Sequence, residues 1–386
     1  MQIGIITPYD LAAPGGVNAY AFTTATWLRR QGHDVDVIGP SSGTDGSGLG
    51  PIPPGSVVIG RARRVHVGGT AVPIAIGPSA RRAILEHLHS ANYDVIHVHE
   101  PFMPWLSVQA IRHADSPIVG TFHGAERIGR WAYRTLRPPM GRWAWRMDVR
   151  TAVSRTAVAT ARPFADDAEI VPCPIDVESF AAPMERPVEL RTDARTILFV
   201  GRADARKGLR TLLEAYGDLR LAHARIELIV IGPRDRAMRR LERSVERRGW
   251  EDVRFLGPRA HATLPAYYQA ADVFCSPALG GEAFGIVLAE AMAAGTPVVG
   301  GDNAGYRNVV RTPAEGILVA PKDAGALSAA IDRILRDRAL ADALRENGLR
   351  RVAELDIERV GQRLLGLYHR ARQGQRYTSR EPLAPG

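Results

Sequence analysis

The chain has 386 residues and contains little cysteine, little lysine and no long apolar run. Two cysteines, Cys173 and Cys275, exclude a disulfide framework and a multi-cysteine zinc site, and they fit a reducing compartment. Since no window of about 18 uninterrupted apolar residues occurs, we expect no bilayer-spanning helix. The N-terminus has no basic segment and Pro8 interrupts its apolar run, so we expect no signal peptide and a cytoplasmic protein.

Charge is one-sided, with a formal net charge of +9. Lys207 and Lys322 are the only lysines, so nearly all of the positive charge comes from arginine. A biased genome composition explains such an excess, and an anionic partner such as a phosphate, a lipid headgroup or a nucleic acid would also suit it. Apolar residues make up 45% and charged residues 24%, which excludes a mostly disordered or fibrous protein.

The alternation of short strands and helices predicts an α/β protein with two doubly wound, Rossmann-like domains. The strands are continuous β-branched runs, typical of parallel strands covered on both faces. A proline-bearing break near 171–180 separates the two series. We expect domains over 1–174 and 175–356, a helix over 357–372 and a disordered tail over 373–386. Two such domains facing each other enclose a cleft, with ligands at the carboxyl ends of the strands.

The expected strands and helices are defined by these runs. The strands are 2–7, 35–39, 95–98, 118–121, 196–201, 226–231, 253–256, 273–276 and 297–300. The clearest helices are 17–31, 102–113, 236–248, 285–294 and 357–372. Functional motifs should therefore follow directly after strands, and several do.

Two loops that each follow a strand and precede a helix are candidates for phosphate binding. Gly15 and Gly16 would let the backbone approach a phosphate at a helix N-terminus, although glycine is common in such turns. The loop 201–208 offers up to three cations, among them Arg202 and Lys207. Such a cluster can neutralise a diphosphate leaving group without a metal, whereas the alternative is a solvated charge run.

Glu282 and Glu290 lie on either side of an expected helix start, in the run GEAFGIVLAE. At about 1.5 Å per helical residue they are roughly 12 Å apart, beyond the roughly 5–9.5 Å of paired-carboxylate hydrolysis. The separation suits two hydroxyl-bearing rings joined through a diphosphate. Backbone amides at the helix start would point toward the ligand, namely those of Ala283, Phe284, Gly285 and Ile286. The alternative, two surface glutamates on an amphipathic helix, suits this apolar helix poorly.

Histidines end two neighbouring strands. His97 and His99 share one face of a strand, so a metal site is conceivable, but spacing places no third ligand. We therefore expect no bound metal and no cofactor. His123 ends the next strand, and a histidine there favours a hydrogen bond to a sugar.

The segment 126–150 combines seven arginines and two acids with several aromatic side chains. Its tryptophans are Trp131, Trp143 and Trp145. Arginine mixed with tryptophan is typical of a membrane-interface patch, and a helix pair with aromatic core residues is the open alternative. Arg81 and Arg82 form a weaker patch of the same kind. No nucleic-acid-binding module occurs, so we expect no nucleic-acid partner.

These motifs resemble the retaining family 4 glycosyltransferases of GT-B fold, over nearly the whole chain to about residue 372. The resemblance is carried by GR and KG at 201–208 and by GE-x₇-E followed by AMAAGTPVV. More narrowly, PYDLAAPGGV, HVHEP and TFH are similar to segments of bacterial enzymes that mannosylate phosphatidylinositol at the inner face of the cell membrane. The resemblance implies a peripheral enzyme that uses GDP-mannose, needs no metal, and returns its last helix to the first domain.

The resemblance also implies roles for the matching residues on the donor side. Gly16 would lie at the donor diphosphate, where Arg202 and Lys207 would hold the phosphates and stabilise the leaving nucleotide. Glu290 would bind the ribose hydroxyls. Glu282, with the amides that follow it, would bind the donor sugar. The retention of these residues argues against an epimerase or a non-enzymatic binding protein of the same fold.

On the acceptor side, the resemblance implies that His123 contacts the sugar near the reacting carbon and that Tyr9 lines the acceptor pocket. The segment 259–264 departs from the mannosyltransferase pattern, which has acidic and lysine residues suited to guanine. An acid accepts hydrogen bonds from guanine N1–H and N2–H₂, whereas this segment offers Arg259 and His261. A UDP-sugar donor with another lipid or a soluble acceptor therefore stays open as the alternative.

Overall fold

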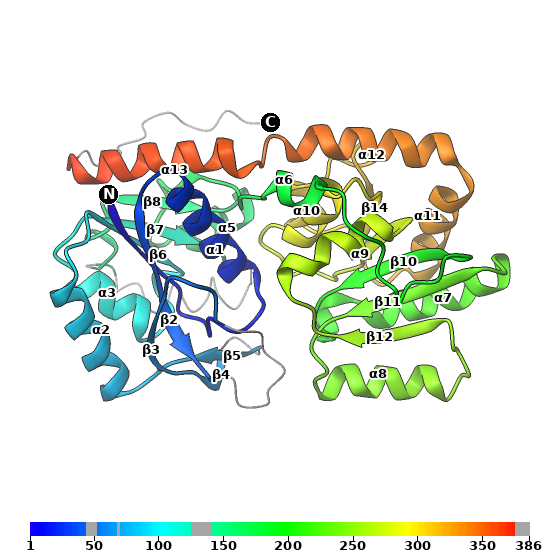
Figure 1. The fold of residues 1–386 in the computed structure, drawn as a ribbon, viewed down its shortest axis with the longest axis horizontal. Coiled ribbons are helices and arrows are strands. Elements are labelled where there is room, and N and C mark those ends of the chain that lie inside the picture. Colours follow the sequence, from blue (N-terminus) through cyan, green and yellow to red (C-terminus); the bar gives the residue numbers. More distant parts are fainter. Residues whose placement is uncertain (44–51, 68–69, 125–140, 142, 375–386) are drawn as a thin grey trace. The chain divides into compact units, whose positions relative to one another are not determined.

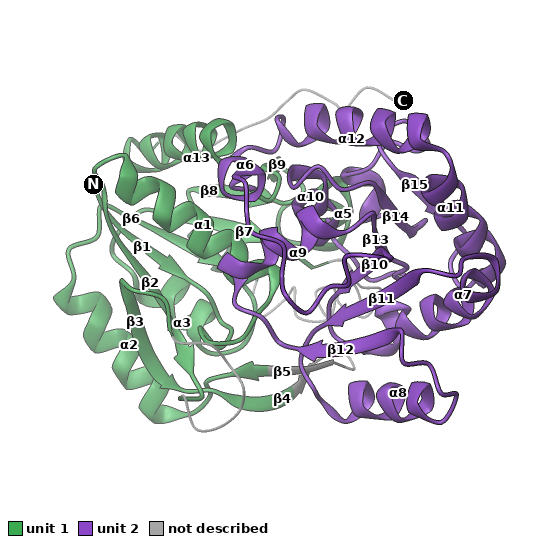
Figure 2. Ribbon diagram, turned by 45° about the vertical axis from the view of Figure 1, so that its right-hand side comes forward, with its two compact units in different colours: residues 1–174, 357–386 green, residues 175–356 purple. Residues whose placement is uncertain are grey.

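The computed structural model describes most of the chain. The described residues are 1–43, 52–67, 70–124, 141 and 143–374. The chain divides into two compact units, which Figure 2 colours separately. Unit 1 comprises Met1–Pro174 and Ile357–Gly386, and unit 2 comprises Ile175–Asp356. These divisions fall at the residues expected from the sequence, and the tail from residue 375 onward lies outside the described residues.

Unit 1 is built on a seven-stranded parallel sheet of order β3-β2-β1-β6-β7-β8-β9 (Figure 1). Its strands are β1 (Gln2–Ile6), β2 (Asp34–Ser41), β3 (Ser56–Arg61), β6 (Val95–His99), β7 (Ile118–Phe122), β8 (Val149–Ala152) and β9 (Glu169–Ile170). Strands β6 and β7 are buried at every residue, as expected of strands covered on both faces. The strand order reverses between β1 and β6, so the carboxyl ends of these two strands form a topological switch point.

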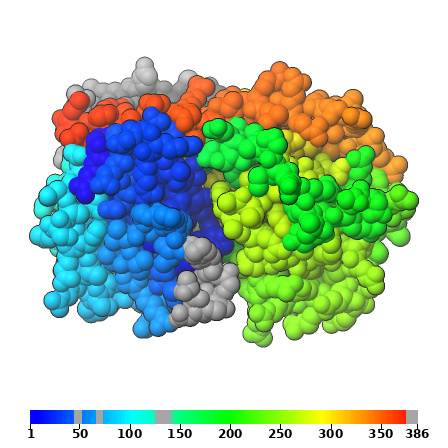
Figure 3. Space-filling view, in the orientation of Figure 1, coloured from blue at the N-terminus to red at the C-terminus, as the bar shows by residue number. Residues whose placement is uncertain are grey.

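The helices of unit 1 include the last one in the chain. They are α1 (Gly16–Arg30), α2 (Pro78–Ser90), α3 (Leu106–His113), α5 (Arg155–Ala161) and α13 (Ile357–Arg372). Helix α13, drawn in red, lies on the N-terminal segment that is drawn in blue (Figure 3). The helix packs closely on α1, because a Cβ at Gly361 would lie 2.6 Å from the ring of Trp27.

A two-stranded antiparallel hairpin was not anticipated from the sequence. It consists of β4 (Arg63–Val67) and β5 (Thr70–Ile74). Its arginines and Pro73 obscure the strand pattern, because charged residues and proline are unusual within strands. The backbone of Tyr9 forms an antiparallel bridge with Ile74, and the Asp10 amide donates to the Pro73 carbonyl at 3.0 Å. The hairpin therefore fixes the loop that follows β1.

Unit 2 contains a six-stranded parallel sheet of order β12-β11-β10-β13-β14-β15. Its strands are β10 (Arg195–Val200), β11 (Ile226–Ile231), β12 (Val253–Gly257), β13 (Val273–Ser276), β14 (Val298–Gly301) and β15 (Ile317–Val319). This is the 3-2-1-4-5-6 order of a Rossmann-like fold. Its switch point lies between β10 and β13, which pair directly.

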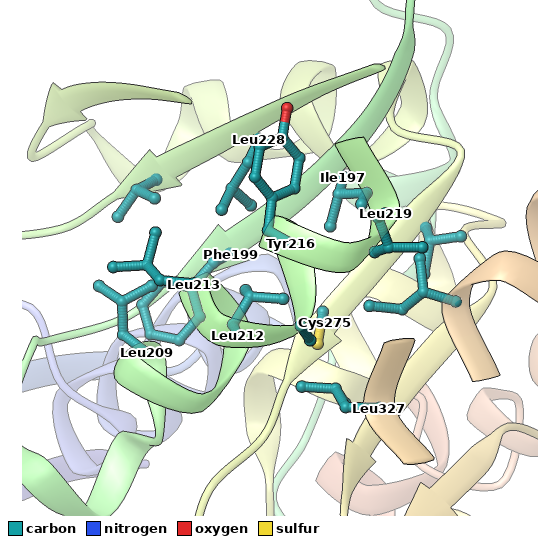
Figure 4. Close-up of a cluster of buried hydrophobic side chains, with 14 of the residues drawn as sticks. Ile197, Phe199, Leu209, Leu212, Leu213, Tyr216, Leu219, Leu228, Cys275 and Leu327 are labelled. Carbon is teal, nitrogen blue, oxygen red and sulfur yellow. The ribbon is translucent and has the colours of Figure 1, made fainter. Parts of the chain in front are cut away.

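Helices cover this sheet and close its core. They are α6 (Val177–Ala181), α7 (Leu209–Ala222), α8 (Arg236–Glu246), α9 (Leu264–Ala270), α10 (Ile286–Ala293), α11 (Ala324–Arg336) and α12 (Arg338–Val352). The apolar face of α7, with Leu209, Leu212 and Tyr216, packs against Ile197 and Leu228 of the sheet (Figure 4). The 3.6-residue apolar spacing of α7 therefore matches the face that it buries.

The interdomain linker expected over 171–180 is only partly confirmed. The chain does pass from unit 1 to unit 2 between Pro174 and Ile175. The following residues form α6 rather than an irregular linker, because the Asp176 side chain caps the helix by accepting from the Ser179 amide at 3.2 Å.

Candidate active site

Two predicted loops meet at the switch point of the unit 2 sheet. The loop 201–208 follows β10 and the segment 281–290 follows β13, and these strands are neighbours. This arrangement places Lys207 Nζ 2.9 Å from Glu282 Oε1, with both side chains largely covered. The structure therefore brings together a cation and a carboxylate that the sequence assigns to one site.

The loop after β10 can adopt its conformation only with glycine at its end. Gly208 has φ of 70°, and a Cβ there would lie 2.0 Å from the carbonyl oxygen of Pro277. Asp204 caps the 3₁₀ turn η1 (Ala205–Lys207) through its side chain. Arg202 lies 3.4 Å from the same carboxylate and is 42% exposed. Both expected phosphate ligands are thus paired with acids, and neither side chain is fully buried.

The second loop ends where α10 begins. Gly285 has φ of 115°, and a Cβ there would lie 2.6 Å from the ring of Tyr306. Glu282 lies in the loop before this turn, and Glu290 lies in the second turn of α10, as expected from the sequence. The intervening residues that would offer backbone amides are Ala283, Phe284, Gly285 and Ile286. The apolar helix is buried over most of its length, so Glu290 is an acid in an apolar setting.

Glu290 is only 4% exposed and receives two side-chain hydrogen bonds. His261 Nε2 lies 3.0 Å from Oε1, and the Tyr268 hydroxyl donates to Oε2 at 3.1 Å. Burial lowers the pKa of His261, but the hydrogen bond and negative charge of Glu290 outweigh it, so that pKa is raised. Burial also raises the pKa of Tyr268 well above its ordinary value, with Glu290 adding to the shift.

Tyr268 was missed by sequence reasoning. It belongs to α9, which precedes β13, and no spacing links it to Glu290. His261 was considered only as a contact to the nucleotide base. The structure shows that its imidazole is directed to Glu290.

Arg259 is engaged within the protein. Its guanidinium donates to the Tyr267 hydroxyl at 2.9 Å, to the Leu256 carbonyl at 2.6 Å and to Glu189 at 3.1 Å. It also donates to the Pro258 carbonyl at 3.3 Å. The expected donor-binding role of Arg259 would therefore have to share a guanidinium that already has four partners.

In unit 1, the glycine loop precedes α1 as expected. The helix begins at Gly16, and Gly15 is the residue before it, with an extended backbone. Space lies open at Gly15, where a Cβ would meet nothing within 4 Å. Tyr9 belongs to the same loop, which the hairpin holds in place.

His123 follows β7 and lies beside two other histidines of unit 1. Its Nε2 is 2.8 Å from His99 Nδ1, and its amide donates to Glu100 Oε1 at 3.2 Å. Burial, with a smaller contribution from His97, lowers the pKa of His123 to about 3. The imidazole is therefore neutral near pH 7 and suits hydrogen bonding to a sugar better than proton donation.

His97 is explained by its surroundings. It is fully buried, with Nδ1 2.8 Å from the Tyr368 hydroxyl and Nε2 2.6 Å from Thr121 Oγ1. Burial lowers the pKa of His97 to about 3. Among the described residues, no group of three His, Cys, Asp or Glu side chains could hold a metal ion.

The residues expected at the membrane differ in their contacts and exposure. Arg81 binds Gln109 at 3.2 Å, and Arg82 is 82% exposed and paired with Glu86. Trp143 is part-buried, with the guanidinium carbon of Arg112 4.7 Å from its ring centroid.

Trp145 is 67% exposed and stacks beneath Arg150, whereas Trp131 lies outside the described residues. Of the helices that the structure describes, none is long and apolar enough to cross a bilayer.

Comparisons with known proteins identify the fold and the family of the chain. The sequence model "Glycosyltransferase Family 4" matches residues 14–179, and "Glycosyl transferases group 1" matches residues 183–351. Sucrose-phosphate synthase from Thermosynechococcus elongatus is similar in structure, with a TM-score of 0.76, 26% identity and coverage of 96% of this chain and 98% of its own. Anabaena HepE, solved with UDP and glucose, has a TM-score of 0.74 at 19% identity and coverage of 96% and 99%. The chain is a glycosyltransferase of the GT-B fold.

A curated relative narrows this assignment. The phosphatidyl-myo-inositol mannosyltransferase of Mycolicibacterium smegmatis is 34% identical over 373 residues, covering 95% of this chain and 93% of the relative. The chain belongs to the phosphatidyl-myo-inositol mannosyltransferase family.

Proposed function

We propose that the enzyme transfers mannose, with retention, from GDP-mannose to phosphatidylinositol at the inner face of the cell membrane. The assignment of the donor site rests on the ion pair between Lys207 and Glu282 at the switch point of unit 2. The buried Glu290 lies in α10, the helix that follows the loop of Glu282. Family membership supports the mannose and the phospholipid acceptor. The proposal assigns most of the donor contacts to unit 2 and the acceptor to unit 1.

The donor would be held along the loops after β10 and β13. Arg202 and Lys207 bind the diphosphate, Glu282 with the amides after it binds the sugar, and Glu290 binds the ribose. Within the protein, Glu282 forms an ion pair with Lys207. On binding, the carboxylate turns to sugar hydroxyls and the ammonium to phosphate, which exchanges one charged hydrogen bond for others.

Transfer breaks the bond between the anomeric carbon and the phosphate oxygen. The acceptor hydroxyl forms its bond to that carbon on the same face, and its proton passes to the leaving phosphate. Arg202 and Lys207 stabilise the negative charge that develops on the diphosphate, which is the role a divalent metal has in other transferases. For unit 1, the proposal keeps the roles that the resemblance implies: Gly16 for the diphosphate, His123 for the sugar and Tyr9 for the acceptor.

A UDP-sugar donor, with another acceptor, is the second candidate. The run PRAHATL at 258–264 contains no acid that could accept from guanine, and Arg259 is already held by Glu189. HepE, whose solved structure contains UDP, shares the fold.

A transfer assay distinguishes the two. The enzyme is incubated with phosphatidylinositol vesicles and either GDP-mannose or UDP-glucose, and the glycolipid is detected by mass spectrometry. Mannosylated lipid from GDP-mannose supports the proposal. Product from UDP-glucose alone favours the second candidate, and no product from either, despite nucleotide binding, contradicts the acceptor.

A further inference from the structure

Glu290 is held at both carboxylate oxygens by side chains from outside its own helix. His261, in the 3₁₀ turn η2 (His261–Thr263), lies 3.0 Å from Oε1. Tyr268, in α9, donates to Oε2 at 3.1 Å. The terminal torsion of a glutamate is otherwise broad, so these two contacts determine how the carboxylate is turned.

The two contacts leave a defined set of acceptor positions. An ionised carboxylate has about four, two on each oxygen. At Glu290 each oxygen uses one for a protein donor and keeps one. The two that remain, one on each oxygen, can accept from two neighbouring hydroxyls of one ring.

We propose that Tyr268 and His261 are positioning residues that orient the Glu290 carboxylate to bind the 2′- and 3′-hydroxyls of the donor ribose. The inference rests on the proposed function, which gives Glu290 the ribose. Neither residue touches the ribose, and both act through the carboxylate.

The packing around the two donors supports this role. Tyr268 is fully buried, and its ring lies 5.2 Å from that of Phe274 and 5.9 Å from that of Phe180. His261 meets Phe180 edge-on at 5.6 Å. Because these contacts are made entirely within the protein, they can orient the carboxylate without help from the nucleotide, which reduces the ordering cost of binding.

The test measures how strongly the enzyme distinguishes a ribonucleotide from its 2′-deoxy counterpart. Calorimetry gives the Kd of GDP, 2′-deoxy-GDP, UDP and 2′-deoxy-UDP for the full chain. In the wild type, loss of the 2′-hydroxyl is expected to weaken binding about tenfold or more, because the acceptor is charged. Tyr268→Phe and His261→Ala are each expected to reduce this ratio to about threefold.

Two further variants separate positioning from general damage. His261→Gln keeps an N–H donor near Oε1, so it is expected to restore most of the ratio. Tyr267→Phe removes a neighbouring hydroxyl that binds Arg259 and Glu189 instead of Glu290, so it is expected to leave the ratio unchanged.

The outcomes separate this inference from the proposed function. If the wild type binds none of the four nucleotides, the proposed function fails. If Tyr268→Phe and His261→Ala bind nucleotides with an unchanged ratio, the inference is overturned and the proposed function stands. An equal loss of affinity for ribo- and deoxynucleotides also overturns it. Should Tyr268→Phe fold poorly, the half-exposed His261 gives the result alone.

Discussion

Lys207 is the residue on which binding of the donor diphosphate should depend most. Its ammonium lies in the loop after β10, 2.9 Å from Glu282. Lys207→Ala is expected to weaken GDP or UDP binding by about tenfold to a hundredfold, since a charge-assisted hydrogen bond contributes about 1.5–3 kcal/mol. Turnover should fall further, because the leaving phosphate loses its counter-charge. Calorimetry and the transfer assay measure the two effects.

Lys322→Ala provides the control, because Lys322 is the only other lysine and is exposed. It should bind and turn over like the wild type. Unchanged turnover of Lys207→Ala would show that the ammonium does not act on the phosphates.

The residues of this site could be predicted only where a local sequence motif identifies them. Glu282 and Glu290 follow from their spacing around a helix start. The donors to Glu290 do not, because Tyr268 and His261 reach it from segments that only the fold brings near. Arg259 likewise gave no sign of its pairing with Glu189, 70 residues earlier in the chain.

Among the elements, α13 offers a matched pair of glycines. Gly361 is buried, and a Cβ there would lie 2.6 Å from the ring of the fully buried Trp27. Gly361→Ala should therefore destabilise unit 1 by about 1–3 kcal/mol through overpacking against α1. Differential scanning calorimetry would detect the lowered unfolding temperature, and hydrogen exchange would locate faster opening in α13.

Gly366→Ala is the control in the same helix. Gly366 is exposed and a Cβ there meets nothing within 4 Å, so alanine should stabilise the helix by about 0.5–1 kcal/mol. Equal behaviour of the two variants would mean that α13 does not pack on α1 as described.

Strands were easier to predict than short or polar elements. Buried parallel strands such as β11 and β13 are mostly apolar, and their predicted bounds match the structure. The two-residue β9 and the arginine-bearing hairpin carry no such run. Helix α6 was read as a linker because prolines precede it and only one of its residues is buried. Contacts with neighbouring elements stabilise these short elements, and the sequence pattern does not reveal those contacts.

At the scale of the whole chain, the division into units could be predicted because both halves show the same order of strands and helices. Each sheet starts with a strand, a glycine-containing loop and a helix, and each reverses its order after three strands. The return of α13 to unit 1 could not be derived from periodicity. It depends on long-range contacts such as the ion pair of Arg372 with Asp94, and it was expected only from the resemblance.

Membrane docking is an expectation for the whole molecule, and the structure distinguishes the two tryptophan candidates that it describes. Trp145 is 67% exposed, whereas Trp143 is part-buried under Arg112. Trp145→Ala should weaken binding to phosphatidylinositol vesicles about tenfold, since burying a large apolar side chain contributes about 1.5–3 kcal/mol, and should leave GDP binding unchanged.

Trp143→Ala should instead lower the unfolding temperature. Leu221→Ala, a 90% exposed site in unit 2, controls for lost apolar surface in a vesicle co-sedimentation assay. Equal vesicle binding by Trp145→Ala and Leu221→Ala would remove this surface from the docking site and leave Trp145 as an exposed side chain without that function.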